Sequence, residues 1–153
     1  MYQGESGYDC PVVRIELAGI AVSGDENQFL ALLRAPGGEV LPISIDSAQA
    51  ISIAAGRGSE RPDRPLTHDL VMSVLELFGA TIERVEITDL KDGVFFASLV
   101  LARSGVSFEV DARPSDAMAL AVRSGAPIFV AESVIEEAAM RDDDLTDSGG
   151  AKA

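Results

Sequence analysis

The sequence predicts an α+β protein: a single compact domain of two similar strand-rich halves, each followed by an alanine-rich helix, around a mixed or antiparallel sheet. Short stretches of alternating apolar and polar residues occupy much of the chain, as in half-buried strands. Similar small-residue segments, at 47–54 and 115–122, follow the strands of each half. The length of 153 residues suits one domain, which we place at 12–140, with disordered tails at 1–11 and 141–153.

The first half is predicted to contain three strands and then a helix. Alternation of apolar and polar residues marks the strands, at 13–17, 28–34 and 40–45. Asp46 or Ser47 can cap the helix, because both side chains accept hydrogen bonds from the first turn. The helix is expected to end at Gly56, since glycine suits the left-handed position at a helix C-terminus.

A basic loop and an amphipathic helix separate the two halves. Three arginines fall within the eight positions from Arg57 to Arg64, the densest positive stretch of the chain. Thr67 is expected to cap the next helix, which runs through Phe78 and ends at Gly79. One face of this helix is apolar, with Leu70, Val74, Leu75 and Phe78.

The second half repeats the order of strands and then a helix. Its strand patterns are at 82–90, 94–103 and 106–111, and Asp92-Gly93 marks a hairpin between the first two. Pro114 can begin a helix that reaches about Ser124, and Gly125 stops it. A short buried strand is expected at 127–130. Ser133 and Glu136 have the spacing of a capping box for a last helix, which ends near Met140.

Composition limits the function classes that suit the chain. The 12 basic and 25 acidic residues give a net charge of −13, which opposes non-specific binding to nucleic acid unless a basic patch or metal ions intervene. Cys10 and His68 are the only residues of their types, which excludes an intrachain disulfide and an intrachain Cys/His zinc site. Neither a membrane helix nor a secretory signal is evident, so we expect a cytoplasmic protein. Few aromatic residues and no tryptophan make a thin core, which favours a homo-oligomer, with a dimer preferred.

Three sets of polar residues are candidates for a functional site. The segment from Asp111 to Asp116 lies where a strand meets a helix, and a helix N-terminus attracts anions; its side chains can equally be caps. His68 can act as a general acid or base near neutral pH, or it can simply pack beside Thr67 while Asp69 favours the helix dipole. The four residues Asp69, Asp89, Asp111 and Asp116 could hold Mg²⁺, or each could end a strand or cap a turn.

Four segments together resemble the bifunctional nuclease (BFN) domain family of bacteria and plants. They are Leu41-Pro42-Ile43-Ser44-Ile45, Arg64-Pro65-Leu66-Thr67-His68-Asp69-Leu70, the stretch 87–97, and Asp111-Ala112-Arg113-Pro114-Ser115-Asp116-Ala117 with 127–130 beyond it. The resemblance spans most of 12–140 and implies a compact α+β domain with nuclease activity, since RNase and DNase activities are ascribed to plant members. Asp46 and Gln49 depart from the glycine and glutamate that relatives usually carry, and the Gln49 amide cannot take a proton.

Two functions follow as hypotheses. In the first, the chain hydrolyses phosphodiester bonds of RNA or DNA with a divalent metal, Mg²⁺ or Mn²⁺. The catalytic residues would be His68, Asp69 and Asp116; the substrate-binding residues Arg64, Thr67, Arg113 and Ser115; and the metal ligands Asp89, Asp111 and Asp116. In the second, the chain is a non-catalytic oligomeric module that binds a small anionic ligand or a protein partner. In either case we expect one cluster that contains His68, Asp69, Asp111, Arg113 and Asp116.

Overall fold

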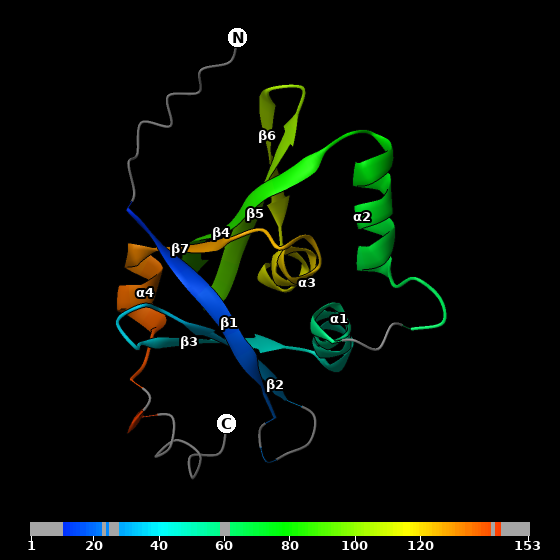
Figure 1. The fold of residues 1–153 in the computed structure, drawn as a ribbon. Helices are drawn as coiled ribbons and strands as arrows, with labels where there is room; N and C mark the ends of the chain where they lie inside the picture. The colour runs from blue at the N-terminus through cyan, green and yellow to red at the C-terminus, as the bar shows by residue number, and fades with distance from the viewer. Residues whose placement is uncertain (1–10, 23, 25–27, 59–61, 142, 145–153) are drawn as a thin grey trace.

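One mixed sheet carries the part of the chain that the computed structural model describes, which is residues 11–22, 24, 28–58, 62–141 and 143–144. The elements in order are β1 (Val12–Val22), β2 (Phe29–Arg34), β3 (Val40–Ile45), α1 (Ser47–Arg57), α2 (Thr67–Leu77), β4 (Thr81–Lys91), β5 (Val94–Arg103), β6 (Val106–Ala112), α3 (Pro114–Ser124), β7 (Ile128–Ala131) and α4 (Glu132–Ala138). This confirms the predicted α+β class (Figure 1). The predicted tails lie largely at 1–10, 142 and 145–153, outside the described residues.

The sheet joins the two predicted halves through its last strand. The strand order is β3-β2-β1-β7-β4-β5-β6, so β1–β3 and β4–β6 each form an antiparallel meander. Strand β7 lies between them, antiparallel to β1 and parallel to β4. Ile128 and Val130 of this central strand point to one face of the sheet and are buried in the core cluster, which also contains Met118 of α3.

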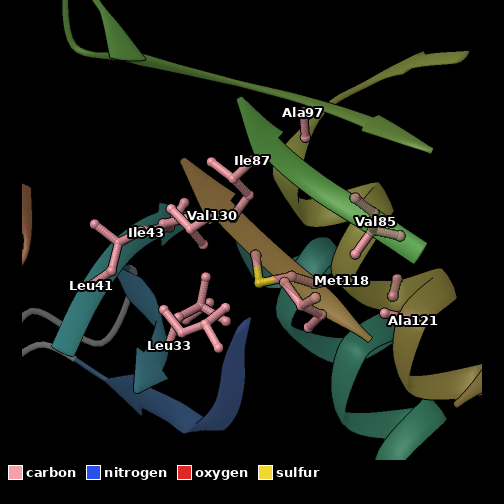
Figure 2. Packing of buried hydrophobic residues seen from close by; sticks show 14 of the residues in the cluster. Leu33, Leu41, Ile43, Val85, Ile87, Ala97, Met118, Ala121 and Val130 are labelled. Carbon is pink, nitrogen blue, oxygen red and sulfur yellow. The ribbon is translucent and has the colours of Figure 1, made fainter. Parts of the chain in front are cut away.

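The main core lies between the sheet and helices α1 and α3. Leu33, Val85 and Val130 of the sheet and Met118 of α3 are fully buried in one cluster (Figure 2). Along β4 the buried positions alternate, whereas four consecutive residues of β5 and most of β7 are buried. Figure 1 shows α1 and α3 side by side, with α4 on the other side of β1. Among the described residues, no helix is both long and apolar enough to cross a membrane.

Close contact between α1 and α3 gives Gly56 a role that differs from the predicted one. The helix continues through Arg57 and is capped by Gly58. A Cβ atom at Gly56 would lie 2.6 Å from Val122 Cγ2 and 2.9 Å from Arg123 Nη1. Glycine at this position is therefore required by packing, not by a left-handed C-cap.

Two predicted helix starts are wrong by one or two residues. Thr67 is the first residue of α2, not its cap; Leu66 is the cap, and its N–H donates to Asp69 Oδ2 at 2.8 Å. Helix α4 begins at Glu132, so Ser133 lies inside it. The N-cap residue is Ala131, and no side-chain hydrogen bond caps the helix there. The chain leaves β7 directly into this helix, which leaves no room for the predicted capping box. The hairpin prediction is confirmed, with positive φ at Asp92 and Gly93.

Candidate active site

His68 lies in a line of hydrogen bonds that joins three helices. Its Nδ1 is 2.6 Å from Ser52 Oγ, and its Nε2 is 2.8 Å from Asp116 Oδ1. Ser52 belongs to α1, His68 to the first turn of α2 and Asp116 to the first turn of α3. Residues that are far apart along the chain thus meet because the three helices pack together.

Arg113 forms the solvent-facing end of this arrangement. It is the N-cap residue of α3, and its guanidinium donates from Nε to Asp116 Oδ2 at 2.8 Å and from Nη2 to Asp116 Oδ1 at 3.2 Å. Side-chain exposure rises along the series, from 15% at His68 to 28% at Asp116 and 68% at Arg113. The site therefore opens to solvent on its cationic side.

Asp116 is held in its ionised form. Burial opposes ionisation, but hydrogen bonds from Arg113 and His68, together with their charges, outweigh it and lower the pKa of Asp116. The Asp116 hydrogen bond and charge raise the pKa of Arg113, and the nearby charge of Asp46 adds to the effect. The pair is consequently a carboxylate and a guanidinium.

The ionised Asp116 fixes the position of a proton on His68. A carboxylate only accepts hydrogen bonds, so Nε2 must carry a hydrogen. In the neutral imidazole Nδ1 then accepts from the Ser52 hydroxyl, and in the imidazolium it donates to Ser52 Oγ. Because a hydroxyl can do either, Ser52 is compatible with both protonation states of His68.

Asp69, next to His68 in sequence, has different partners. Its Oδ2 accepts from the Leu66 N–H, and its Oδ1 accepts from Arg123 Nε at 2.8 Å. The Arg123 side chain is only 7% exposed and also donates from Nη1 to the carbonyl of Ala119. These bonds fix the start of α2 against α3, and with it the position of His68.

The residues expected to bind substrate are spread around the start of α2 and α3. Arg113 is exposed at the site, and Thr67 is exposed beside His68. Ser115 is buried at the start of α3. Arg64 lines a neighbouring cavity of about 590 Å³ together with Asp69 and Arg123.

Asp89 and Asp111, the other expected metal ligands, lie on the opposite face of the sheet. Asp111 pairs with Ser98 and Asp89 pairs with Phe96, whereas Ala97 and Leu99 face the core beneath α3. Both aspartates line a separate cavity of about 390 Å³. The expected single cluster is therefore correct for His68, Arg113 and Asp116 and wrong for Asp111, because side chains alternate along β6.

The described side chains form no ready-made site with several metal ligands. None of them form a group of three or more His, Cys, Asp or Glu residues that could hold one. Asp116 contributes both carboxylate oxygens to bonds with cationic or N–H donors. A metal at Asp116 would have to compete with Arg113 for the same oxygens.

Comparison with known proteins identifies the family. The sequence profile described as the bifunctional nuclease domain matches residues 31–143. The chain belongs to the bifunctional nuclease domain family. The match includes Ser52, His68, Arg113 and Asp116, which are the residues of the hydrogen-bonded line.

Bacterial and plant proteins share this domain. An uncharacterized protein of Mycobacterium tuberculosis is 40% identical over 134 residues, which are 87% of this chain and 80% of that protein. Bifunctional nuclease 2 of Arabidopsis thaliana is 31% identical over 73% of this chain, and Bifunctional nuclease 1 of Oryza sativa subsp. indica is 31% identical over 60%. The matches cover only 34% and 28% of these two plant proteins.

The two departures of this bifunctional nuclease domain from the expected pattern form a reciprocal cap. Asp46 Oδ1 accepts from the Gln49 N–H at 2.8 Å, and Gln49 Oε1 accepts from the Asp46 N–H at 2.9 Å. Capping requires an acceptor oxygen at residue 49, which glutamine supplies as well as glutamate. The substitution therefore preserves the start of α1, and Asp46 adds negative charge near Arg113.

Sequence reasoning missed two residues that build the site of this domain. Ser52 lies between Ile51 and Ile53, and its only signal was a hydroxyl on the buried side of a small-residue helix. Arg123 resembled a cation in the last turn of α3, where it would favour the helix dipole. Neither signal identifies a partner, because both partners lie on α2.

Proposed function

We propose that this domain hydrolyses phosphodiester bonds of RNA or DNA, with His68 as the proton-transfer group. The observation that carries the proposal is the His68–Asp116 hydrogen bond of 2.8 Å beneath the exposed guanidinium of Arg113. A positioned imidazole can give or take a proton, and a guanidinium matches the geometry of phosphate oxygens. The nuclease names of the plant relatives agree with this chemistry.

Substrate would enter from the Asp116 side of His68. Both ring nitrogens are hydrogen-bonded, so one bond must exchange before the imidazole can reach a substrate oxygen. Ser52 is buried, whereas Asp116 is 28% exposed, so Nε2 is the nitrogen that substrate can approach. Arg113 keeps N–H groups beyond those bound to Asp116, and these can hold the phosphate.

Cleavage of labelled single-stranded RNA and DNA by the purified chain tests the proposal. His68→Ala and Asp116→Asn should each lower kcat/KM by about tenfold or more, which corresponds to about 1.4 kcal/mol of barrier. Asp92→Asn makes the same charge change in the distant hairpin turn and should have no effect. Equal cleavage by His68→Ala and the unaltered chain would reject His68 as the proton-transfer group.

A second candidate function is binding of a small anion without cleavage. It is favoured by the same site, because both ring nitrogens of His68 and both carboxylate oxygens of Asp116 are hydrogen-bonded to protein, while Arg113 is the most exposed of the three side chains. Binding of a phosphate-bearing oligonucleotide that Arg113→Ala removes, with no cleavage by any variant, would support this function over the first.

A further inference from the structure

Helix α2 presents an apolar face that the described part of the chain does not cover. None of its eleven residues is buried. Leu70, Val74, Leu77 and, at the C-cap, Phe78 are between 45% and 80% exposed. Their spacing of four, three and one residues places them on one face. An eleven-residue helix is marginal in water without packing, and the inner contacts of α2 are made chiefly with α3.

Edge strand β6 carries a second exposed apolar row. Val106, Phe108 and Val110 are between 42% and 53% exposed. In the sheet register Val110 is opposite Leu99 and Phe108 is opposite Leu101, so the row lies on the face that packs against α3. It is exposed because β6 is at the edge, beyond the strands that α3 contacts most.

The helix face and the strand row approach each other at one corner. Phe78 lies three residues before Thr81, the first residue of β4. Thr81 pairs with Ala102 of β5, and Ala102 pairs with Ser107 of β6. Two strand spacings of about 5 Å therefore separate the start of β4 from β6. In Figure 1 the chain passes from the end of α2 directly into β4, on the side of the molecule where β6 forms the edge. We call the seven side chains together the α2–β6 surface.

We infer that a second copy of this chain covers the α2–β6 surface. The outer face of α2 carries no charge, because its carboxylates, Asp69 and Glu76, line the cavity on its inner side with Arg123. For two chains with a net charge of −13 each, an uncharged face is where mutual repulsion costs least. The same lack of cations makes the surface unsuited to anionic lipid or nucleic acid.

The size of the α2–β6 surface agrees with that of an interface. Seven large apolar side chains, each 42–80% exposed, present several hundred Å² of apolar area. The largest apolar patch on a typical monomer covers about 300–600 Å², and a standard interface takes about 800 Å² from each partner. Flanking polar residues would supply the remainder.

Covering α2 would also affect the candidate site. His68 lies in the first turn of α2, and the inner side of this helix contains no fully buried residue. A second copy packed on the outer side would restrict the motion of α2 and hence of His68. The inferred dimer does not depend on any enzymatic activity, so its test is separate from that of the proposed function.

Measurement of the mass in solution, by light scattering or sedimentation, tests the inference on the full chain. We expect the mass of two chains at a concentration of about 100 μM. Leu77→Glu and Phe108→Glu should each weaken association by at least about tenfold, because each would place a carboxylate in the interface. Val22→Glu is the matched control: Val22 is 60% exposed, but it lies on β1, four strands from β6.

Thermal unfolding of each variant separates loss of association from loss of folding. Leu77 is 80% exposed, so its substitution should leave the fold intact. A mass of one chain for the unaltered protein overturns the inference. An assembly that survives either substitution on the α2–β6 surface, or that dissociates equally with Val22→Glu, also overturns it.

Discussion

At the scale of single residues, the site depends on which polar atoms are satisfied by which partners. Asp116 is the common acceptor for His68 and Arg113. On the other side of the imidazole, Ser52 Oγ is hydrogen-bonded to Nδ1. Sequence alone could identify His68, Arg113 and Asp116 as candidates, because His68 is the only histidine and the other two belong to a polar segment where a strand meets a helix. It could not identify Ser52, since one hydroxyl in an alanine-rich helix resembles any other until its partner is known.

Ser52→Ala should leave His68 Nδ1 without its protein partner. A hydrogen bond of this kind is worth about 1 kcal/mol, and more where a buried polar atom is left unsatisfied. We expect a loss of that size in the free energy of unfolding, measured with denaturant, and a shift of the His68 imidazole nitrogen signals in NMR spectra. Ser47→Ala, at an exposed position of the same helix, should change neither quantity. An unchanged Nδ1 signal in Ser52→Ala would show that the hydrogen bond does not form in solution.

Asp116 should make stability depend on pH in the acidic range. Its pKa in the folded chain lies below the ordinary value of 3.8. The unfolded chain therefore binds the proton first, and the stabilisation by Asp116 is complete above pH 3.8 and lost as the pH falls through the folded pKa. Denaturant titrations of the unaltered chain and of Asp116→Asn should thus differ at pH 6 and converge below about pH 3.8. A difference that stays constant as the pH falls well below 3.8 would contradict the ionised pair.

At the scale of elements, local patterns predicted most strands and helices, and long-range pairing decided their arrangement. Alternation indicated both meanders, and Asp92-Gly93 indicated the β4–β5 hairpin. The central position of β7 could not be predicted, because four residues that pair with β1 and with β4 carry no signal of their partners. The alternation along β6 places Asp111 on the face opposite Val110, but it does not say on which face of the sheet α3 and Asp116 lie.

Gly56→Ala tests the contact between α1 and α3. Alanine is the better helix former by about 1 kcal/mol, so an exposed helical glycine would be improved by the change. Here the new Cβ would lie 2.6 Å from Val122 and 2.9 Å from the buried Arg123, and overpacking of this kind costs about 1–3 kcal/mol. We expect a net loss of stability in denaturant unfolding. Gly19→Ala, which meets no atom within 4 Å, should be tolerated, and a stabilised Gly56→Ala would show that the helices separate easily.

At the scale of the whole molecule, charge sets how a nucleic acid could approach. A net charge of −13 repels phosphate at long range, while Arg113 attracts it only nearby. The net charge thus repels the phosphate that Arg113 would bind. Asp89 and Asp111 lie on the other side of the sheet, so they do not deepen the negative potential immediately around Asp116. The divalent metal expected from the sequence stays a prediction, since Mg²⁺ can bind through one carboxylate together with substrate phosphate and water.

Salt should therefore raise activity on an oligonucleotide, where most nucleic-acid-binding proteins lose affinity with salt. Increasing KCl from about 10 to 100 mM shortens the screening length from about 30 to 10 Å, which weakens the repulsion by distant carboxylates and leaves contacts at Arg113 largely intact. We expect kcat/KM for a short single strand to rise over this range.

MgCl₂ at the same ionic strength is the control for metal binding. An advantage of Mg²⁺ over K⁺ that Asp116→Asn removes and Asp111→Asn retains would place a metal at the His68 site, whereas equal effects of the two salts would mean screening alone. A steep fall of kcat/KM with KCl would contradict the repulsion and indicate that direct contacts between cationic side chains and phosphate dominate binding.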